Sequence, residues 1–353
     1  DYLGTPMDVD ANMGDMLKNG KKVLVSIVGE FGSEPVFRGV GLISDEYSAD
    51  NTQTSEGKIA WEMMARDSEW ADVLRAFGFP IVHSSTEAVT AISGQALRSM
   101  SKEDIRKVFS RGVLLDLVAL KVLNEMGLGD LAGVEIEKEI TIGSMPLGSE
   151  LLTEPEFGGG KHRLTWGRGT CASKKLGVLK PAKGARVISQ ILDPDLKPVF
   201  PGAVIYENTL GGRVAVYPED FSSVFNADPC KKGTASAFYS EYRRMQMQAV
   251  IKWLAKDSVP MMVRANGWIL PHRSDMKDKT ALAAMNINTD NWDKVKIEAC
   301  IQRRVKKVKL MDSKGNWKIL GKGWKQTEDK FEMEVKTDLP LYGLFAAVLE
   351  FSK

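Results

Sequence analysis

Short apolar runs alternate with helical periods of apolar residues from about residue 37 to residue 135. Val40–Ser44, Ile81–His83 and Gly112–Asp116 are apolar runs of strand length. Ile59–Phe77 and Leu117–Met126 carry apolar residues at the spacing of an amphipathic helix. Strands that alternate with helices indicate an α/β fold with a parallel, doubly wound sheet.

The pattern differs on both sides of this region. The residues before it contain one strand candidate, Val23–Val28. Between about 136 and 184 the alternation fails, and we expect a β-rich, irregular insertion there. The chain then predicts a hairpin across Asn208–Gly212 and a long amphipathic helix over Ala235–Ala255.

The period changes to two after Pro260. Apolar and charged residues alternate over Val295–Ala299 and again over Phe331–Val335, which is typical of strands with one polar face. We therefore expect a small antiparallel β-sandwich at 258–353. The predicted organisation is a lead-in segment at 1–36, an α/β domain at 37–257 that includes the irregular insertion, and this sandwich.

Composition excludes several functional classes. The 353 residues (39.0 kDa) are 43% hydrophobic and 27% charged, as in ordinary globular proteins, and the net charge is only +2, which argues against a nucleic-acid partner. The longest apolar runs, such as Leu341–Leu349, are shorter than the ~20 residues that span a bilayer, so no membrane partner is expected. Cys171, Cys230 and Cys300 are few and widely spaced. We interpret them as free thiols in a reducing, cytoplasmic setting.

Motifs for the common catalytic and cofactor chemistries are missing. There is no G-x-S-x-G nucleophile elbow, and the Gly127–Gly133 glycines follow a predicted helix and precede a strand, the reverse of a dinucleotide-binding turn. His83, His162 and His272 lie far apart and match no metal-ligand spacing. The sequence therefore assigns no cofactor and no metal.

Paired carboxylates are the remaining candidate chemistry, because glycosidases place two of them around the scissile bond. Glu30 follows the predicted strand at 23–28, Asp45 and Glu46 follow the next strand, and Glu207 lies in the predicted hairpin. His83 ends a predicted parallel strand, where open α/β sheets bind ligands. A stand-alone hydrolase or amidotransferase-like enzyme would use these residues, but the sequence favours no particular pair.

Four segments carry a family resemblance: Ala91–Leu97, Gly112–Val134, Pro201–Tyr217 and Tyr242–Leu254. Together they resemble the C-terminal, non-catalytic region of proteins related to the family 42 β-galactosidases. The resemblance implies a flavodoxin-like (class I glutamine-amidotransferase-like) domain that mediates trimer contacts, followed by a β-sandwich. It covers about residues 37 to 353.

The catalytic (α/β)8 barrel of that family has no counterpart here, because a barrel takes ~250 residues and about 36 precede the sheet. No catalytic residue is carried over, so whether the chain is itself an enzyme stays open. The start at Asp1, without Met, suggests a cut within a longer protein. We expect an accessory and oligomerisation region of a glycoside-hydrolase-like protein.

Two expectations concern partners. The chain should form a homo-oligomer, with a trimer slightly favoured, or pack against the missing barrel, and the stretch from Gly158 to Gly169 with Trp166 should cover that partner. An alternative function is a carbohydrate-binding module centred on Trp292, Trp317 and Trp324 of the sandwich.

Overall fold

The computed structural model describes residues 11–31, 34–43, 69–141, 144–164, 175–219 and 240–352. The chain divides into two compact units that are interleaved along the sequence. The sandwich unit contains Asp1–Gly39, Gly78–Pro80 and Met261–Lys353, and the mixed-sheet unit contains Val40–Phe77 and Ile81–Pro260. Asp45, Glu46, Trp166, Cys171 and Cys230 lie outside the described residues.

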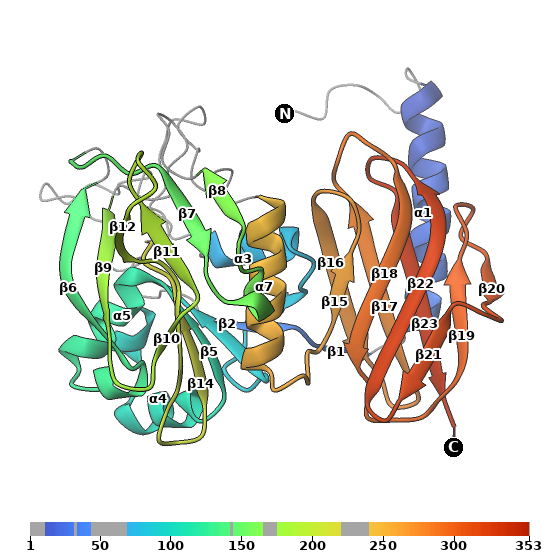
Figure 1. Ribbon diagram of the computed structural model, residues 1–353. Coiled ribbons are helices and arrows are strands. Elements are labelled where there is room, and N and C mark those ends of the chain that lie inside the picture. The colour runs from blue at the N-terminus through green and yellow to red at the C-terminus, as the bar shows by residue number, and fades with distance from the viewer. Residues whose placement is uncertain are drawn as a thin grey trace, which may run out of the picture. The chain divides into compact units, whose positions relative to one another are not determined.

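A seven-stranded sheet forms the centre of the mixed-sheet unit (Figure 1). Its strands, in spatial order, are β10 (Arg186–Val187), β13 (Val204–Glu207), β14 (Arg213–Val216), β5 (Gly112–Leu115), β4 (Val89–Ile92), β2 (Val40–Ile43) and β3 (Ile81–Val82). The five strands from β14 to β3 are parallel, and β13 and β10 add to them antiparallel. All residues of β4 and β5 are buried, as expected for strands in the middle of a parallel sheet that is covered on both faces.

Two antiparallel sheets contain strands from the region that the sequence predicts to be β-rich and irregular. One contains β12 (Pro198–Pro201), β11 (Ser189–Leu192), β7 (Ser149–Leu152) and β8 (His162–Leu164); the other pairs β6 (Val134–Thr141) with β9 (Lys175–Pro181). Strands β6 to β9 lie wholly or mostly within 136–184, where the sequence predicts a β-rich, irregular insertion. Their individual positions were not predicted, because two of them carry charged residues on buried positions and their pairing partners lie far away in sequence.

The helices of this unit begin where the sequence supplies capping groups. They are α3 (Glu69–Ala76), α4 (Lys102–Phe109), α5 (Leu117–Glu125) and α7 (Glu241–Leu254), with 3-10 turns η2 (Ala96–Ser99), η3 (Gly129–Leu131) and η4 (Pro155–Phe157). Ser101 caps α4 by accepting the N–H of Asp104, Asp116 caps α5, and Ser240 caps α7. Helices α4 and α5 pack their apolar faces onto the sheet around Val113 and Val214.

The predicted fold class, a flavodoxin-like doubly wound parallel sheet, was wrong. Four of the five sheets in the described residues are antiparallel throughout, and the fifth is mixed. The predicted strands at β2, β3 and β5 do exist and run parallel to one another in the seven-stranded sheet. The error lay in extending their alternation to the rest of the domain, where hairpin pairing replaces helical crossovers.

Two antiparallel sheets share one core in the sandwich unit (Figure 1). The first contains β1 (Val36–Phe37), β16 (Ile269–Asp275), β17 (Lys279–Asn286), β23 (Leu344–Phe351), β19 (Val305–Met311) and β20 (Trp317–Ile319). The second contains β15 (Met262–Arg264), β18 (Trp292–Cys300), β22 (Lys330–Leu339) and β21 (Trp324–Thr327). Strands β18 and β22 are the two with alternating apolar and charged residues in the sequence, and they pair with each other.

Helix α1 (Ala11–Phe31) belongs to the sandwich unit and includes the segment predicted as a strand, Val23–Val28, so that prediction was wrong. An apolar run of this length fits a strand or a helix equally well by periodicity, and contacts decide between them. Ser26 donates a hydrogen bond to the Gly315 carbonyl (2.6 Å) and accepts one from the Trp317 indole (3.4 Å). Within the described residues, no helix combines the length and apolarity needed to cross a membrane.

Candidate functional site

The sequence-predicted candidates that the structure describes lie apart from one another. Glu30, on α1, accepts hydrogen bonds from Lys309 (3.0 Å) and Lys279 (3.2 Å). Burial alone would raise its pKa, but the two ammonium groups outweigh this and hold the pKa of Glu30 below its usual value. Glu30 therefore anchors α1 to the sandwich.

His83 and Glu207 belong to the mixed-sheet unit but lie at different places on its sheet. The exposed His83 follows the edge strand β3, whereas Glu207 ends β13, five strand positions away or roughly 24 Å at ~4.8 Å per strand. Because β13 runs antiparallel, Glu207 lies beside the start of β14, where it pairs with Arg213 at 3.2 Å. The two residues cannot act on one bond.

The carboxyl ends of the parallel strands carry a different set of polar residues. Ser93 follows β4, Asp116 follows β5, and Glu219 lies three residues beyond β14; all three are buried. The Asp116 carboxylate accepts hydrogen bonds from the N–H groups of Ala119 (2.7 Å) and Gly94 (3.2 Å). Open α/β sheets bind ligands at this edge. We therefore take it as the candidate site.

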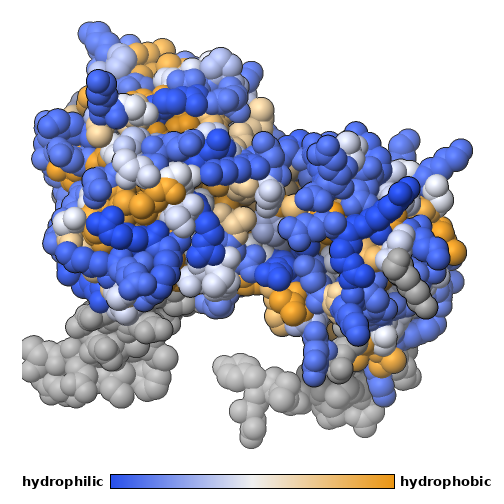
Figure 2. All heavy atoms as spheres, turned by 90° about the horizontal axis from the view of Figure 1, so that it is seen from below, coloured by the Kyte–Doolittle hydropathy of each residue, from blue (hydrophilic) through white to orange (hydrophobic). Residues whose placement is uncertain are grey.

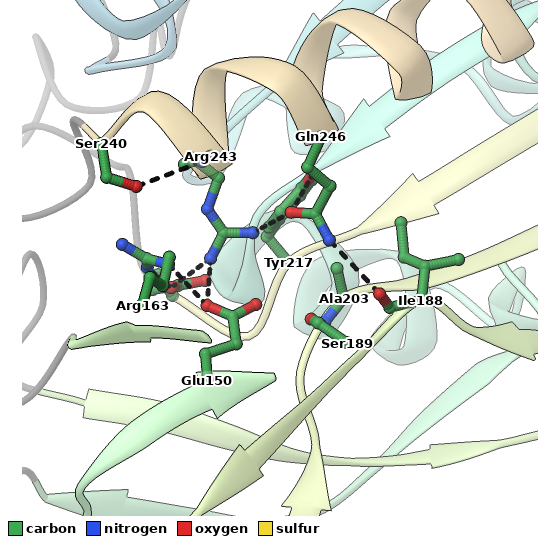
Figure 3. Close-up of polar contacts among 10 residues, drawn as sticks. Glu150, Arg163, Ile188, Ser189, Ala203, Tyr217, Ser240, Arg243 and Gln246 are labelled. Atoms are coloured by element: carbon green, nitrogen blue, oxygen red, sulfur yellow. Dashed lines mark hydrogen bonds and ion pairs between the residues drawn. The ribbon is translucent and has the colours of Figure 1, made fainter. Parts of the chain in front are cut away.

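A cluster of buried charges lies at this edge, and Glu150 of β7 is at its centre (Figure 3). Arg163 of β8 donates from Nε to Glu150 Oε2 at 2.8 Å, and Arg243 of α7 donates to the same oxygen. The side chains of Glu150 and Arg243 are at most 1% exposed and that of Arg163 is 3% exposed. Three elements distant in sequence are thus joined at one carboxylate.

Glu219 is the second acid of this cluster. Its Oε1 lies 3.8 Å from Arg243 Nη2 and 3.9 Å from Arg163 Nη2, so both guanidinium groups lie near both carboxylates. The other oxygen, Oε2, has no hydrogen-bond partner among the described residues. Two cations and two anions therefore share one buried volume with a formal net charge of zero.

Tyr217 and Gln246 complete the surroundings of Arg243. The guanidinium group lies 5.0 Å from the Tyr217 ring centroid, and it donates to Gln246 Oε1. Gln246 in turn donates to the Ile188 carbonyl at 3.4 Å (Figure 3). Arg243 is thus held by a carboxylate, an amide and an aromatic face.

The two acids have opposite pKa shifts. Burial raises the pKa of both, but for Glu150 the charges of Arg243 and Arg163 outweigh burial and hold its pKa below the usual value. For Glu219, burial and the neighbouring Glu150 prevail over the more distant arginines, so its pKa is raised. Burial likewise raises the pKa of Tyr217.

Diverging pKa values in an acid pair can mark a general acid and a base. Here, however, both carboxylates are sealed from solvent and share the same two guanidinium groups. A glycosidase needs room between its carboxylates for a sugar and a water molecule. The arrangement joins β7, β8 and α7, and among the described residues each of these two carboxylates is only 1% exposed.

Sequence reasoning overlooked this cluster because its members are spread from residue 150 to residue 243. One signal was available. Arg243, Gln246, Met247 and Val250 lie on one face of α7 and are buried, whereas Tyr242 and Met245, which the apolar pattern assigns to the core, are 38% and 44% exposed. A charge on the buried stripe of a helix indicates a buried partner.

The described residues contain no group of three or more His, Cys, Asp or Glu side chains that could hold a metal ion. Of the tryptophans proposed for sugar binding, Trp292 is fully buried in the sandwich core. Trp317 contacts α1 through its indole N–H, and Trp324 is partly exposed. The proposal of three exposed tryptophans is therefore wrong for Trp292.

No protein-family model and no curated protein sequence matches the chain. Solved structures do match it. α-L-Fucosidase isoenzyme 2 from Paenibacillus thiaminolyticus has a TM-score of 0.61 at 10% identity, over 92% of this chain and 50% of that enzyme. The β-galactosidase of Rahnella sp. R3 has a TM-score of 0.55 at 14% identity, over 99% and 46% of the two chains.

A catalytic mutant of Gan42B, a GH42 β-galactosidase from G. stearothermophilus, gives a similar result, with a TM-score of 0.54 at 11% identity over 97% of this chain and 44% of that one. At such identities the similarity concerns the fold. The fold of this chain is thus shared with glycoside hydrolases, and the chain spans half or less of their length.

Proposed function

We propose that this chain is the accessory region of a glycoside-hydrolase-related protein of carbohydrate metabolism and that catalysis belongs to another part of that protein. The fold similarity supports this, since it runs through 92% or more of this chain but half or less of each enzyme. One of these enzymes is a GH42 β-galactosidase, from the family that the sequence segments resemble.

The observation that carries the proposal is the closed acid pair. Glu150 and Glu219 are two acids of one cluster, yet each is 1% exposed and lies against two arginines. Glu30 and Glu207 are committed to lysine and arginine partners at different places. A pair of free carboxylates facing a cleft is what a self-sufficient glycosidase would need.

Turnover by the purified chain tests this proposal. We expect the chain to hydrolyse aryl β-galactosides, aryl α-fucosides and simple amides no faster than buffer without protein does. Hydrolysis that disappears in Glu207→Gln or His83→Gln would overturn the proposal and favour a stand-alone enzyme.

The partner surface that we propose is the outer face of α1. Leu24, Val25 and Val28 are 61%, 63% and 67% exposed, although the opposite face, with Ser26 and Glu30, already packs on the sandwich. A contiguous apolar patch exposed on a helix commonly marks an interaction site. On the face drawn in Figure 2, by comparison, hydrophobic residues form separate patches among hydrophilic ones.

We propose that the catalytic barrel covers this face, and that a second copy is the alternative. The double variant Leu24→Ser, Val28→Ser should lower the binding of an apolar dye to the chain, because it removes exposed apolar area. The matched control is Lys21→Ser, Lys22→Ser on the same exposed side of α1. A dye signal equal in both variants would contradict the proposal.

Light scattering distinguishes between these two partners of α1. A mass of 39.0 kDa for the original chain would support the barrel as the partner. A mass three times as large that falls to that of the monomer in the double variant would assign the face to a homotrimer.

A further inference from the structure

A groove opens on the sandwich unit between loops of its two sheets. Its walls are formed by Gln302 and Arg304 in the loop before β19, by Trp324 and Gln326 of β21, and by Glu328 and Asp329 in the turn before β22. The groove has a volume of about 490 Å³, within the ~300–1,000 Å³ of small-molecule sites. We call it the Trp324 groove.

The frame of the Trp324 groove is held by hydrogen bonds. The Gln326 amide accepts the N–H of Val305 (2.8 Å) and donates to the carbonyls of Ile301 and Arg303 (3.0 Å each). The N–H of Ile301 donates to the carbonyl of Asp329 at 2.6 Å. The loop before β19 is thereby tied to strand β21 and to the β21–β22 turn, so the groove exists before any ligand arrives.

Trp324 forms an aromatic wall in a fixed orientation. Its ring stacks on that of Phe331 with centroids 6.0 Å apart, and its indole N–H donates to the Leu320 carbonyl at 3.2 Å. Phe331 is itself fully buried in the sandwich core. The part of the indole that lines the groove is therefore a rigid, apolar surface with an electron-rich face.

The polar side chains around this wall are uncommitted. Within the described residues, Gln302, Arg304, Glu328 and Asp329 are exposed and make no side-chain hydrogen bond or ion pair. They provide donors (Arg304), acceptors (Glu328 and Asp329) and an amide that does both. An anionic ligand would meet two carboxylates, and a cationic one would meet Arg304.

We propose that the Trp324 groove binds a neutral saccharide. A sugar ring presents an apolar C–H face that can lie on the indole, and hydroxyl groups that both donate and accept hydrogen bonds. This combination matches one aromatic wall surrounded by donors and acceptors of mixed charge better than an anion, a cation or a purely apolar ligand does. The site goes beyond the proposed accessory role, because it gives the sandwich unit a ligand of its own.

Calorimetric titration of the whole chain tests the proposal, with lactose, cellobiose, maltose and methyl β-galactoside as probes. We expect saturable binding of at least one of them. Trp324→Ala should weaken it at least about tenfold, and Trp324→Phe should retain most of it, because an aromatic face remains. Trp317→Ala, on the same unit but outside the groove, should bind as the original chain does.

A second variant separates binding from folding. Asp329→Asn changes only an exposed side chain, so the fold should persist while affinity falls several-fold through the loss of a charged acceptor. The absence of binding to all four sugars would overturn the proposal, and so would binding that Trp324→Ala and Asp329→Asn leave unchanged. Neither result bears on turnover or on the partner of α1, so this proposal can fail separately from the proposed function.

Discussion

The buried charges around Glu150 illustrate how much a single side chain can contribute when its partners are also buried. Arg163 and Arg243 both donate to its carboxylate, and neither guanidinium group reaches solvent to an appreciable extent. Such a pair is costly to bury, but removing one member is worse, because the remaining charges lose their partner without regaining water.

Glu150→Gln should therefore destabilise the mixed-sheet unit strongly. We expect a loss of roughly 3–5 kcal/mol in the free energy of unfolding, measured by urea denaturation with circular dichroism. Glu207→Gln removes an exposed ion pair with Arg213 and is the matched control, expected to change the same quantity by less than about 1 kcal/mol. Equal effects of the two variants would contradict the role assigned to the cluster.

His272 on β16 should make the sandwich unit sensitive to mild acid. Burial lowers the pKa of its imidazole, whose ring lies 5.3 Å from that of Phe37. The folded state therefore binds fewer protons than the unfolded state below the unfolded pKa of about 6.5. The contribution of neutral His272 to stability is complete above that pH, and it is lost as the pH falls through the pKa of His272 in the folded state.

Melting temperatures between about pH 7.5 and pH 5.5 check this linkage. The original chain should lose stability across the interval, and His272→Gln should lose less. His162→Gln replaces an exposed histidine of β8, in the other unit, and is the control variant. A slope that His272→Gln does not reduce would assign the titration to other groups.

At the scale of elements, Gly78 marks a place where the backbone leaves no room for a side chain. Its φ is +93°, and a Cβ there would lie 1.9 Å from the carbonyl oxygen of Val263, within the same unit. The Val263 N–H also donates to the Gly78 carbonyl at 2.8 Å, so the two chain segments cannot move apart without losing that hydrogen bond.

Gly78→Ala should lower the free energy of unfolding by clearly more than the unfavourable backbone conformation alone would. Gly127 also has a positive φ, +71°, but nothing lies within 4 Å of a Cβ built there. Gly127→Ala should cost about 1–2 kcal/mol for the left-handed backbone, and Gly78→Ala several kcal/mol more for the clash. Thermal unfolding of both variants measures the difference, and a similar loss for both would refute the steric argument.

Elements with local signals were predictable from the sequence. The helical spacing of apolar residues over 117–126 predicted α5, and the apolar runs at 40–44 and 112–116 predicted β2 and β5. The antiparallel strands β6 and β9 carry no such signal, since six of their fifteen residues are charged and their pairing joins residues about forty positions apart. Long-range pairing of this kind depends on the partner and is invisible in a local window.

The candidate site was less predictable than the fold, for a related reason. Glu30 and Glu207 could be singled out because they follow apolar runs, but in the structure they are ion-paired at separate places. Glu150, Arg163 and Arg243 become neighbours only when β7, β8 and α7 have packed. Burial, which gives these charges their importance, cannot be read from their residue types.

For the whole molecule, the similarity to glycoside hydrolases extends through both units, while no curated sequence matches. A fold can persist at 10–14% identity because packing needs only apolar residues of suitable size at core positions. Function requires particular residues at a site, so a shared fold at this identity does not assign one.

The interleaving of the two units has a consequence for how the protein is made. Helix α1 and strand β1 are synthesised early, yet their partners β16, β17 and β19 come late; Glu30 meets Lys279 across 249 residues of chain. At ~5–20 residues per second, a ribosome needs roughly 12–50 s to supply those partners. During that time the mixed-sheet unit can fold, while the apolar residues of α1 stay exposed to solvent. The nascent chain should therefore depend on chaperones more than the finished protein does.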